Sequence, residues 1–303
     1  MSVPPVSVVM TTHNHEAFVA DAVRSVLQQT WPNLQIVISD DGSTDATWDI
    51  VQDVLGQYTG PHRVHAQRHP TNIGAPRNLQ SVVDAATGKL QVMAHGDDIA
   101  FPHRVETIAR LWRCTGASLI SHNAVLASGP DQPSKLLRDV QPDEQLSLLD
   151  VSAGTWTTQM LGASFAWDVG LRAAFDPVDR RLLARGQDHV LPLRGALLKG
   201  CWYIGEPLMM WRQHPAQLTK DTGDLFGTQA MTDETVAAYH ISTQLQRLRD
   251  VQARRAVADS PELVAAEQRV IMVLKALSER WVAHRSELED TAHTLRWLPR
   301  GTP

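Results

Sequence analysis

The sequence LQIVISDDGSTD, from Leu34 to Asp45, contains one complete change of backbone structure. Its first half, LQIVIS, is an apolar run rich in β-branched residues and is typical of a strand buried on both faces of a sheet. Its second half, DDGSTD, consists of residues that favour a tight turn and a helix cap. A buried strand that passes through a polar turn into a helix is the repeating unit of parallel α/β sheets. This segment therefore predicts an α/β protein.

The same unit recurs on both sides of this segment. Four further strand-like runs are VSVVMT (6–11), RVHAQ (63–67), LQVMA (90–94) and SLISHNAVLA (118–127). Apolar residues recur at helical spacing between these runs, as they do from Val19 to Leu27. Strands that alternate with helices over the first 125 residues predict a doubly wound, mostly parallel, Rossmann-like sheet.

The composition fits a folded protein with a substantial core. The 303 residues are 43% hydrophobic and 20% charged, and their net charge of −5 argues against a protein that coats nucleic acid. The two cysteines lie far apart and form neither a disulfide framework nor a metal-binding spacing, which fits a reducing compartment. We expect no signal peptide and no membrane-spanning helix, because the sequence has no basic leader and no run of about 18 apolar residues.

Short polar residues follow the predicted strands, where doubly wound sheets bind their ligands. These residues are Thr11, Thr12, His13 and Asn14, then Asp40 and Asp41, then Asn72, Gly74, Arg77 and Asn78, then Asp97 and Asp98. Carboxylates suit Mg²⁺ or Mn²⁺, and an arginine fork suits phosphate, so the set predicts a nucleotide diphosphate held with a divalent cation. Taken alone, DDGSTD could be only a turn with a helix cap.

Motifs of several other enzyme classes are absent from the sequence. It has neither G-x-G-x-x-G nor G-x-x-x-x-G-K-[ST], which argues against a dinucleotide enzyme and a P-loop NTPase. It also lacks H-E-x-x-H and G-x-S-x-G, which argues against zinc proteases and serine hydrolases.

Four segments carry a resemblance to a known family: VSVVMTTHN, IVISDDGSTD, NIGAPRN and AHGDD. They resemble the nucleotide-binding half of the family 2 inverting glycosyltransferases, which have the GT-A fold. The later segment FDPVDRRLLARGQDHVLPLRGALLKGCWYIGEPLMMWRQH resembles the acceptor half of that family. The resemblance runs over roughly residues 5–220 and implies a metal-dependent transferase that uses a nucleotide-sugar.

The resemblance also implies roles for individual residues. The residues expected to contact the nucleotide-sugar are Thr11, His13, Asn14, Asp40, Asp41, Arg77 and Asp97. The cation, Mn²⁺ or Mg²⁺, is expected to bind Asp97 and Asp98, with Asp98 the more direct ligand. His214 is expected to approach the cation or the diphosphate, and Asp188 matches the catalytic base.

The chain departs from the family pattern at several positions. Thr11 and His13 replace a usual Pro and Tyr. His95 stands where many members carry a further Asp, and Gln187 replaces the usual Glu before the base. These departures keep a catalytically silent carbohydrate-binding or scaffold protein open as an alternative. A sugar nucleotidyltransferase is another, although TTHNHEAF lacks the Gly-rich, basic loop it would need.

Histidines near the predicted site invite a further metal assignment. The chain has 13 histidines, and His13 and His15 flank the first strand end. A lone histidine is more often structural or solvated, and we expect neither of these two to bind metal.

We expect two regions in the chain. Residues 1–225 form the glycosyltransferase domain, with a nucleotide-sugar half (1–125) and an acceptor half (126–225), and residues 226–303 form a helical region. Apolar residues recur there every seven positions, at Leu274, Trp281, Leu288 and Leu295. This pattern favours a helix packed on its own domain. A homodimer through these helices and a membrane-surface contact near the C-terminus are the alternatives.

Family analogy suggests the wider setting. It favours a UDP-sugar donor and a saccharide or glycoconjugate acceptor in surface polysaccharide or glycoconjugate assembly. It also favours a cytoplasmic protein, or one held peripherally at the inner face of the membrane, and no nucleic acid partner.

Overall fold

The computed structural model describes residues 5–127, 135–139, 141–153, 160–176, 190–215, 217 and 234–296, with parts of the last range as backbone alone. The strands of this part are β1 (Val6–Thr12), β2 (Gln35–Asp40), β3 (Arg63–Arg68), β4 (Leu90–His95), β5 (Ile99–Ala100), β6 (Leu119–Ala127), β7 (Lys135–Leu136), β8 (Glu144–Leu146), β9 (Ala166–Asp168) and β10 (Cys201–Arg212). The helices are α1 (Val19–Leu27), α2 (Thr47–Gly56), α3 (Ala75–Ala85), α4 (Arg104–Thr115), α5 (Leu148–Ala153), α6 (Gly170–Ala173), α7 (Leu191–Leu198), α8 (Glu234–Val257) and α9 (Pro261–Arg296), with a 3-10 turn at Gly162–Ser164.

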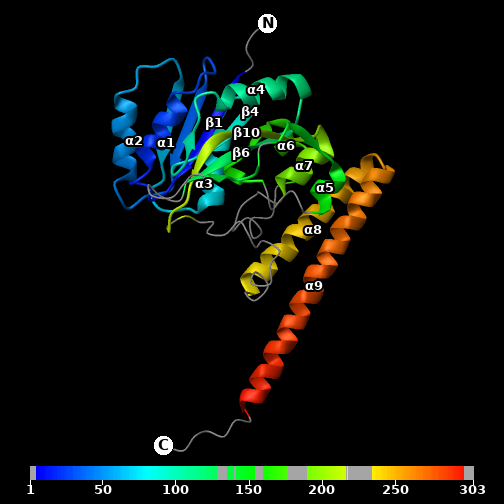
Figure 1. Cartoon of the computed structure of the whole chain (residues 1–303). Helices are drawn as coiled ribbons and strands as arrows, with labels where there is room; N and C mark the ends of the chain where they lie inside the picture. The colour runs from blue at the N-terminus through cyan, green and yellow to red at the C-terminus, as the bar shows by residue number, and fades with distance from the viewer. Residues whose placement is uncertain are drawn as a thin grey trace, which may run out of the picture.

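The strands form one sheet with the order β3-β2-β1-β4-β9-β6-β10-β5, and β7 pairs with β6 and β8 with β10 beside this path. Strands β1, β4, β6 and β10 lie in the middle of the molecule (Figure 1). β3, β2, β1 and β4 are parallel neighbours, and β6 and β10 are parallel to each other. The mostly parallel, doubly wound sheet expected from the sequence is confirmed. β9 separates β4 from β6 and runs antiparallel to both, and it has no counterpart among the predicted strands because three residues are too few to show a period.

Successive residues of a strand point to opposite faces of the sheet, and in the central strands both sets include buried apolar side chains. Helices therefore cover both faces of the sheet. On one face, Val8 and Met10 of β1 pack in a cluster with residues of α1, α2 and α4. On the other face, Val9 belongs to a cluster with residues of α3 and α5 to α9. Burying one such side chain stabilises the fold by about 1.5–3 kcal/mol. The central strands are therefore fixed from both sides, and so are the loops at their carboxyl ends.

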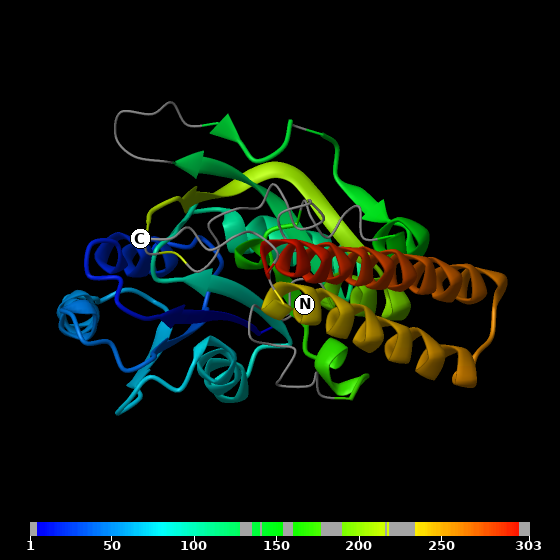
Figure 2. The same ribbon diagram turned by 90° about the horizontal axis from the view of Figure 1, so that it is seen from below.

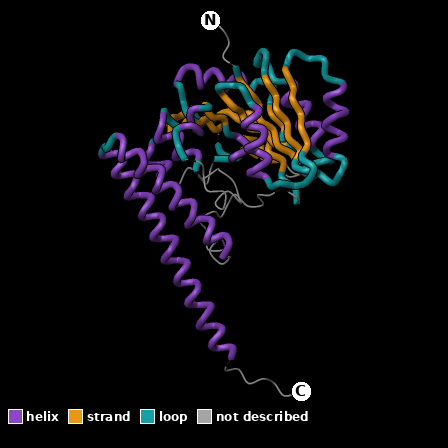
Figure 3. Tube along the Cα trace, turned by 180° about the vertical axis from the view of Figure 1, so that it is seen from behind, coloured by secondary structure: helices purple, strands orange, loops and turns teal. Residues whose placement is uncertain are grey.

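The C-terminal helices α8 and α9 form an antiparallel hairpin that leaves the sheet domain at an angle (Figures 1 and 3). Seen from below, the two helices lie side by side (Figure 2). α8 ends at Val257 and α9 begins at Pro261, where a proline fits the first turn of a helix. Half-buried Trp281 of the predicted seam and buried Leu277 of α9 pack in one cluster with Ile241 of α8. No helix in the described residues is long and apolar enough to cross a membrane.

Candidate active site

Three loops meet at one edge of the sheet because three parallel strands end together. The register pairs Thr12 of β1 with Asp40 of β2, and Thr11 of β1 with His95 of β4. Parallel strands present their carboxyl ends on the same side, which is where ligands bind in such sheets. The sequence expectation that these polar residues share an edge agrees with this register.

Gly96 allows the loop after β4 to lie directly against the loop after β1. Its backbone N–H donates to the Thr11 carbonyl at 2.9 Å. A Cβ atom at this position would lie 2.3 Å from Thr12 Oγ1 and 2.7 Å from His15 Nδ1, which no side chain tolerates. The absence of a side chain at Gly96 therefore brings Asp97, the next residue, close to His15.

Two histidines and one carboxylate converge at this point. Asp97 Oδ2 lies 3.2 Å from His214 Nε2 and 3.8 Å from His15 Nε2. One ligand atom from each residue lies within 4.8 Å of the others, a spacing that could hold a metal ion. The exposed fraction of the side chain is 17% for His15, 14% for Asp97 and 8% for His214, so the cluster is largely shielded from bulk water.

The cluster favours the ionisation states that ligate metal. Burial would raise the pKa of Asp97, but the neighbouring His15 and His95 and the hydrogen bond with His214 hold that pKa below its usual value. Burial lowers the pKa of His15 more than the Asp97 charge raises it. A carboxylate and a neutral imidazole are the forms that bind a cation.

Asp98 has a different environment from its neighbour. Its side chain is buried, and Oδ1 accepts a hydrogen bond from the Arg212 backbone N–H at 3.1 Å. Burial and the adjacent Asp97 charge raise the pKa of Asp98 well above its usual value. The geometry thus favours Asp97, and not Asp98, as the direct ligand, although the prediction that Asp98 ligates the cation stays untested.

Arg212, at the end of β10, holds the parts of the cluster together. Its Nε donates to the Asp97 carbonyl oxygen, and its Nη2 donates to the Phe18 carbonyl oxygen at 2.9 Å. The guanidinium also lies 5.0 Å from the centre of the Phe18 ring, which packs at 4.4 Å against the His214 ring. One arginine therefore connects the loops after β1, β4 and β10.

Asp40 and Asp41 shape the loops at this edge. Fully buried Asp40 accepts hydrogen bonds from the backbone and the hydroxyl of Ser43, and Arg68 Nε lies 3.4 Å from it. Asp41 Oδ1 accepts a 2.7 Å hydrogen bond from the Ile73 backbone N–H and so joins the second loop to the third. The turn interpretation of DDGSTD therefore holds for Asp40, and nucleotide contacts from both residues stay predictions.

The remaining nucleotide-side residues surround these loops. His13 Nε2 lies 3.0 Å from Asn72 Nδ2, and Asn14 Oδ1 accepts a 2.9 Å hydrogen bond from the Thr44 backbone. Thr11 Oγ1 lies 3.1 Å from His95 Nδ1, so the Thr11 side chain faces the neighbouring strand end. Arg77 is exposed in the first turn of α3, and its guanidinium has no partner among the described residues.

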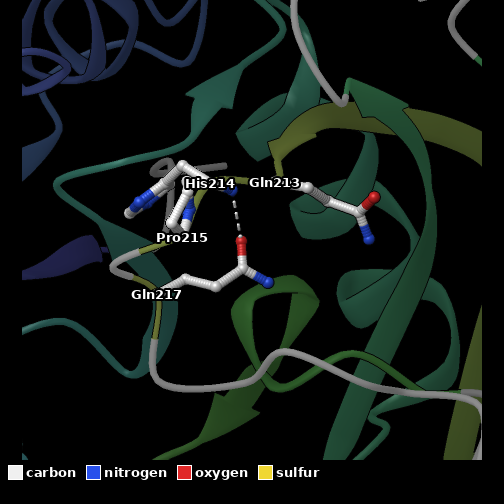
Figure 4. A pocket seen from close by; sticks show the side chains of 4 residues that line it. All are labelled: Gln213, His214, Pro215 and Gln217. Atoms are coloured by element: carbon white, nitrogen blue, oxygen red, sulfur yellow. Dashed lines mark hydrogen bonds between the residues drawn. The ribbon is translucent and has the colours of Figure 1, made fainter.

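A small cavity opens beside His214. It measures about 240 Å³ and is lined by Gln213, His214, Pro215 and Gln217. Figure 4 shows the His214 backbone N–H donating to Gln217 Oε1, at 2.9 Å. The segment after β10 thus places a polar cavity next to the metal-type cluster.

The acceptor side is described only in part. Asp188, the predicted base, lies outside the described residues. Asp168, another carboxylate of the acceptor half, accepts hydrogen bonds from Trp112 Nε1 and the Gly170 backbone N–H, so both of its oxygens are engaged. Asp176 is exposed, and its carbonyl oxygen accepts a hydrogen bond from Arg194.

Two residues of the site were not assigned from the sequence, His15 and Arg212. His15 lies three residues beyond β1, and its backbone N–H donates to Thr47 Oγ1 at 2.7 Å. The position of His15 after a strand end was the sequence signal that it could belong to the site. The direction of its side chain depends on contacts with α2 and Gly96, which are distant in sequence. Arg212 lies in the closing W-R-Q-H segment beside His214, which was the signal for it.

The strand order and the polar edge define a GT-A-fold protein, and solved structures agree. S. aureus TarS 1-349, solved with UDP-GlcNAc, matches with a TM-score of 0.56 and 14% identity over 92% of both chains. The mannosyltransferase PcManGT from Pyrobaculum calidifontis, solved with GDP-Man and Mn²⁺, matches with a TM-score of 0.50 and 17% identity over 99% of this chain and 82% of that one. At these identities the likeness concerns the fold.

Residues 7–165 match the model of Glycosyl transferase family 2, and the chain belongs to that family. The putative glycosyltransferase EpsE of Bacillus subtilis is 33% identical over 103 residues, which are 34% of this chain and 36% of that protein. Glycosyltransferase GlyG of Streptococcus pneumoniae is 28% identical over 34% of this chain and 33% of its own length. The matches thus span about a third of these relatives.

Proposed function

We propose that this chain is a metal-dependent, inverting glycosyltransferase. It moves a sugar from a nucleotide-diphosphate sugar, with a UDP-sugar favoured, to a hydroxyl acceptor. The observation that carries the proposal is the pairing of Asp97 with His214, 3.2 Å apart, at the carboxyl edge of the parallel strands. Family membership supports it, and so do the nucleotide-sugars bound by the solved neighbours, UDP-GlcNAc in TarS and GDP-Man in PcManGT.

A divalent cation, Mn²⁺ or Mg²⁺, fits the residues at this edge. Asp97 and His214 would hold it, since one is an ionised carboxylate and the other an imidazole in direct reach. The bound cation would neutralise charge on the departing diphosphate. Mn²⁺ in the PcManGT structure supports this assignment.

The chain's own side chains supply the other requirements of transfer. Exposed Arg77, whose guanidinium has no partner among the described residues, would pair with a phosphate through its planar fork. Residues of the loops after β1 and β2, including Thr11, His13 and Asp41, would position the nucleotide. Asp188 would remove the proton of the acceptor hydroxyl as the anomeric carbon inverts, which contributes about 10²–10⁴-fold to the rate.

The domain division and the setting complete the proposal. Residues 1–225 carry out the transfer, and the helical region 226–303, of which α8 and α9 are described, supports it. The acceptor is a saccharide or glycoconjugate of surface polysaccharide assembly, reached from the cytoplasmic side. Homodimer formation and peripheral membrane contact through the C-terminal helices stay predictions.

Release of nucleoside diphosphate from a panel of nucleotide-sugars, with and without Mn²⁺ or Mg²⁺, tests the activity. Asp97→Asn should abolish metal-dependent release, whereas Asp53→Asn, an equal change on the exposed side of α2, should leave it intact. In a parallel assay with a nucleoside triphosphate and a sugar 1-phosphate, release of pyrophosphate would indicate a nucleotidyltransferase. No turnover in either assay would favour a silent binding protein. The anomeric configuration of the product, read by NMR, must be inverted.

A further inference from the structure

We propose that His15 is a third protein ligand of the cation, so that His15, Asp97 and His214 form a two-histidine, one-carboxylate site that binds Mn²⁺ and later transition-metal ions before any nucleotide arrives. The inference rests on the proposed function for the identity of the site, and it adds a ligand and a selectivity to it. We call these three residues the HDH cluster.

Distances within the HDH cluster match a shared cation. Metal bonds to imidazole nitrogen and carboxylate oxygen are about 2.0–2.2 Å long, which separates neighbouring ligand atoms by about 3.4 Å at a tetrahedral angle and about 3.0 Å at a right angle. The observed separations from Asp97 Oδ2 are 3.2 Å to His214 and 3.8 Å to His15. One ligand atom of each of the three residues lies within 4.8 Å of the other two, so a modest movement of the side chains toward a shared cation would complete the site.

The second nitrogen of His15 is already engaged, as in metal-binding histidines. Thr12 Oγ1 lies 3.3 Å from His15 Nδ1, and Thr12 is 2% exposed. A partner on Nδ1 fixes the ring orientation and leaves Nε2 to face the cation. The backbone of His15 is held as well, by the hydrogen bond to Thr47 Oγ1, so the ring approaches Asp97 from a fixed base.

The chemistry of the donor atoms sets the selectivity. Mg²⁺ prefers oxygen ligands, keeps its waters and usually binds through one or two carboxylates together with phosphates. Imidazole suits later first-row ions, whose affinities rise from Mn²⁺ through Co²⁺. A site with two imidazoles and one carboxylate should therefore bind Mn²⁺ or Co²⁺ without nucleotide, and Mg²⁺ much more weakly. Positions left open on the cation remain for diphosphate oxygens and water.

The test titrates the full-length protein with MnCl₂ in the absence of nucleotide, with free Mn²⁺ followed by electron paramagnetic resonance. The wild-type protein should bind one Mn²⁺, Co²⁺ should displace it, and a tenfold excess of Mg²⁺ should not. His15→Gln should weaken Mn²⁺ binding by about 10–100-fold or more, the scale known for losing even an outer-shell partner. His65→Gln, which removes an exposed imidazole from β3, should leave the affinity unchanged.

A second measurement keeps the test independent of how well the variant folds. Pulsed electron paramagnetic resonance of Mn²⁺ in the wild-type protein should show nitrogen couplings from two imidazoles. Four results would each overturn the inference. They are nitrogen couplings from only one imidazole, an unchanged Mn²⁺ affinity in a folded His15→Gln protein, an affinity of the wild-type protein for Mg²⁺ equal to that for Mn²⁺, and no Mn²⁺ binding without nucleotide. Because none of these readouts needs sugar transfer, cation binding without turnover on any donor would refute the proposed function and leave this site standing.

Discussion

Replacing Asp250 by alanine should destabilise the whole protein, because it leaves a buried arginine without its counter-charge. Arg194 of α7 donates to the two carboxylate oxygens of Asp250 of α8 at 2.7 and 3.0 Å. The two side chains are 5% and 4% exposed, so water cannot replace the lost partner. This pair joins the helical region to the acceptor half of the sheet domain.

The expected size of the effect follows from that burial. Removing one partner of a buried ion pair costs about 3–5 kcal/mol, against a total stability of about 5–15 kcal/mol for typical domains. Gln246 Nε2, 2.9 Å from Asp250 Oδ1, loses its acceptor as well, which adds about 1 kcal/mol. Urea unfolding, followed by circular dichroism and by the fluorescence of the nine tryptophans, measures the loss.

Two further variants make the reasoning refutable. Asp259→Ala removes an exposed carboxylate that also pairs with an arginine, Arg255, and it should leave the unfolding midpoint unchanged. Arg194→Met combined with Asp250→Leu removes both buried charges and should be more stable than Asp250→Ala alone. The reasoning is wrong if Asp250→Ala lowers the free energy of unfolding by less than about 1 kcal/mol, or if the double variant is less stable than Asp250→Ala. Either result would show that the ion pair does not stabilise the contact between α7 and α8.

Three other perturbations test the site and the core. Asp188→Asn should lower turnover by about 10²–10⁴-fold with nucleotide affinity nearly unchanged, and retained turnover in steady-state kinetics would remove Asp188 from the role of base. Gly96→Ala should abolish Mn²⁺ binding while circular dichroism stays native, because its Cβ would collide with Thr12 and His15; unchanged Mn²⁺ affinity would contradict the close packing. Fully buried His122 accepts a hydrogen bond from Arg104 Nε, and burial holds its pKa well below 6.5. Below pH 6.5 the unfolded chain therefore binds the extra proton, and this histidine should lower stability by up to about 1.4 kcal/mol per pH unit. Urea titrations from pH 7 to 5 should show a smaller pH dependence in His122→Gln, and an equal slope would refute the assignment.

The central fold was predictable because parallel strands buried on both faces leave a continuous apolar run in the sequence. β1, β2 and β4 each have this form, and each ends in polar residues. β10 does not show it. Its twelve residues include Gly205 and Pro207, and its pairing with β6 shifts register on either side of Pro207. Gly and Pro normally argue against a strand interior, and only pairing with β6, which is far away in sequence, holds the strand together.

The candidate site was predictable as an edge, but its geometry was not. The rule that ligands bind at the carboxyl ends of parallel strands brought Asp97 and the loops after β1 and β2 to one place. Which side chains of those loops converge depends on contacts between segments, such as the packing of Gly96 against His15 and the hydrogen bond from Arg212 to the Asp97 carbonyl. No local pattern encodes such contacts.

The sequence does not show which of the adjacent carboxylates Asp97 and Asp98 faces a cation, and the fold gives the two side chains different environments. Two neighbouring negative charges repel, and a buried charge is costly unless it is paired. Here the chain separates the two side chains. Asp98 is buried under a backbone N–H of Arg212 with its pKa raised, whereas Asp97 faces two imidazoles with its pKa lowered. The two neighbouring carboxyl groups therefore have opposite pKa shifts, and the one with the lowered pKa faces His15 and His214. A cation at this edge would meet one carboxylate oxygen flanked by imidazole nitrogens, and the proposed preference for Mn²⁺ over Mg²⁺ rests on this set of donor atoms.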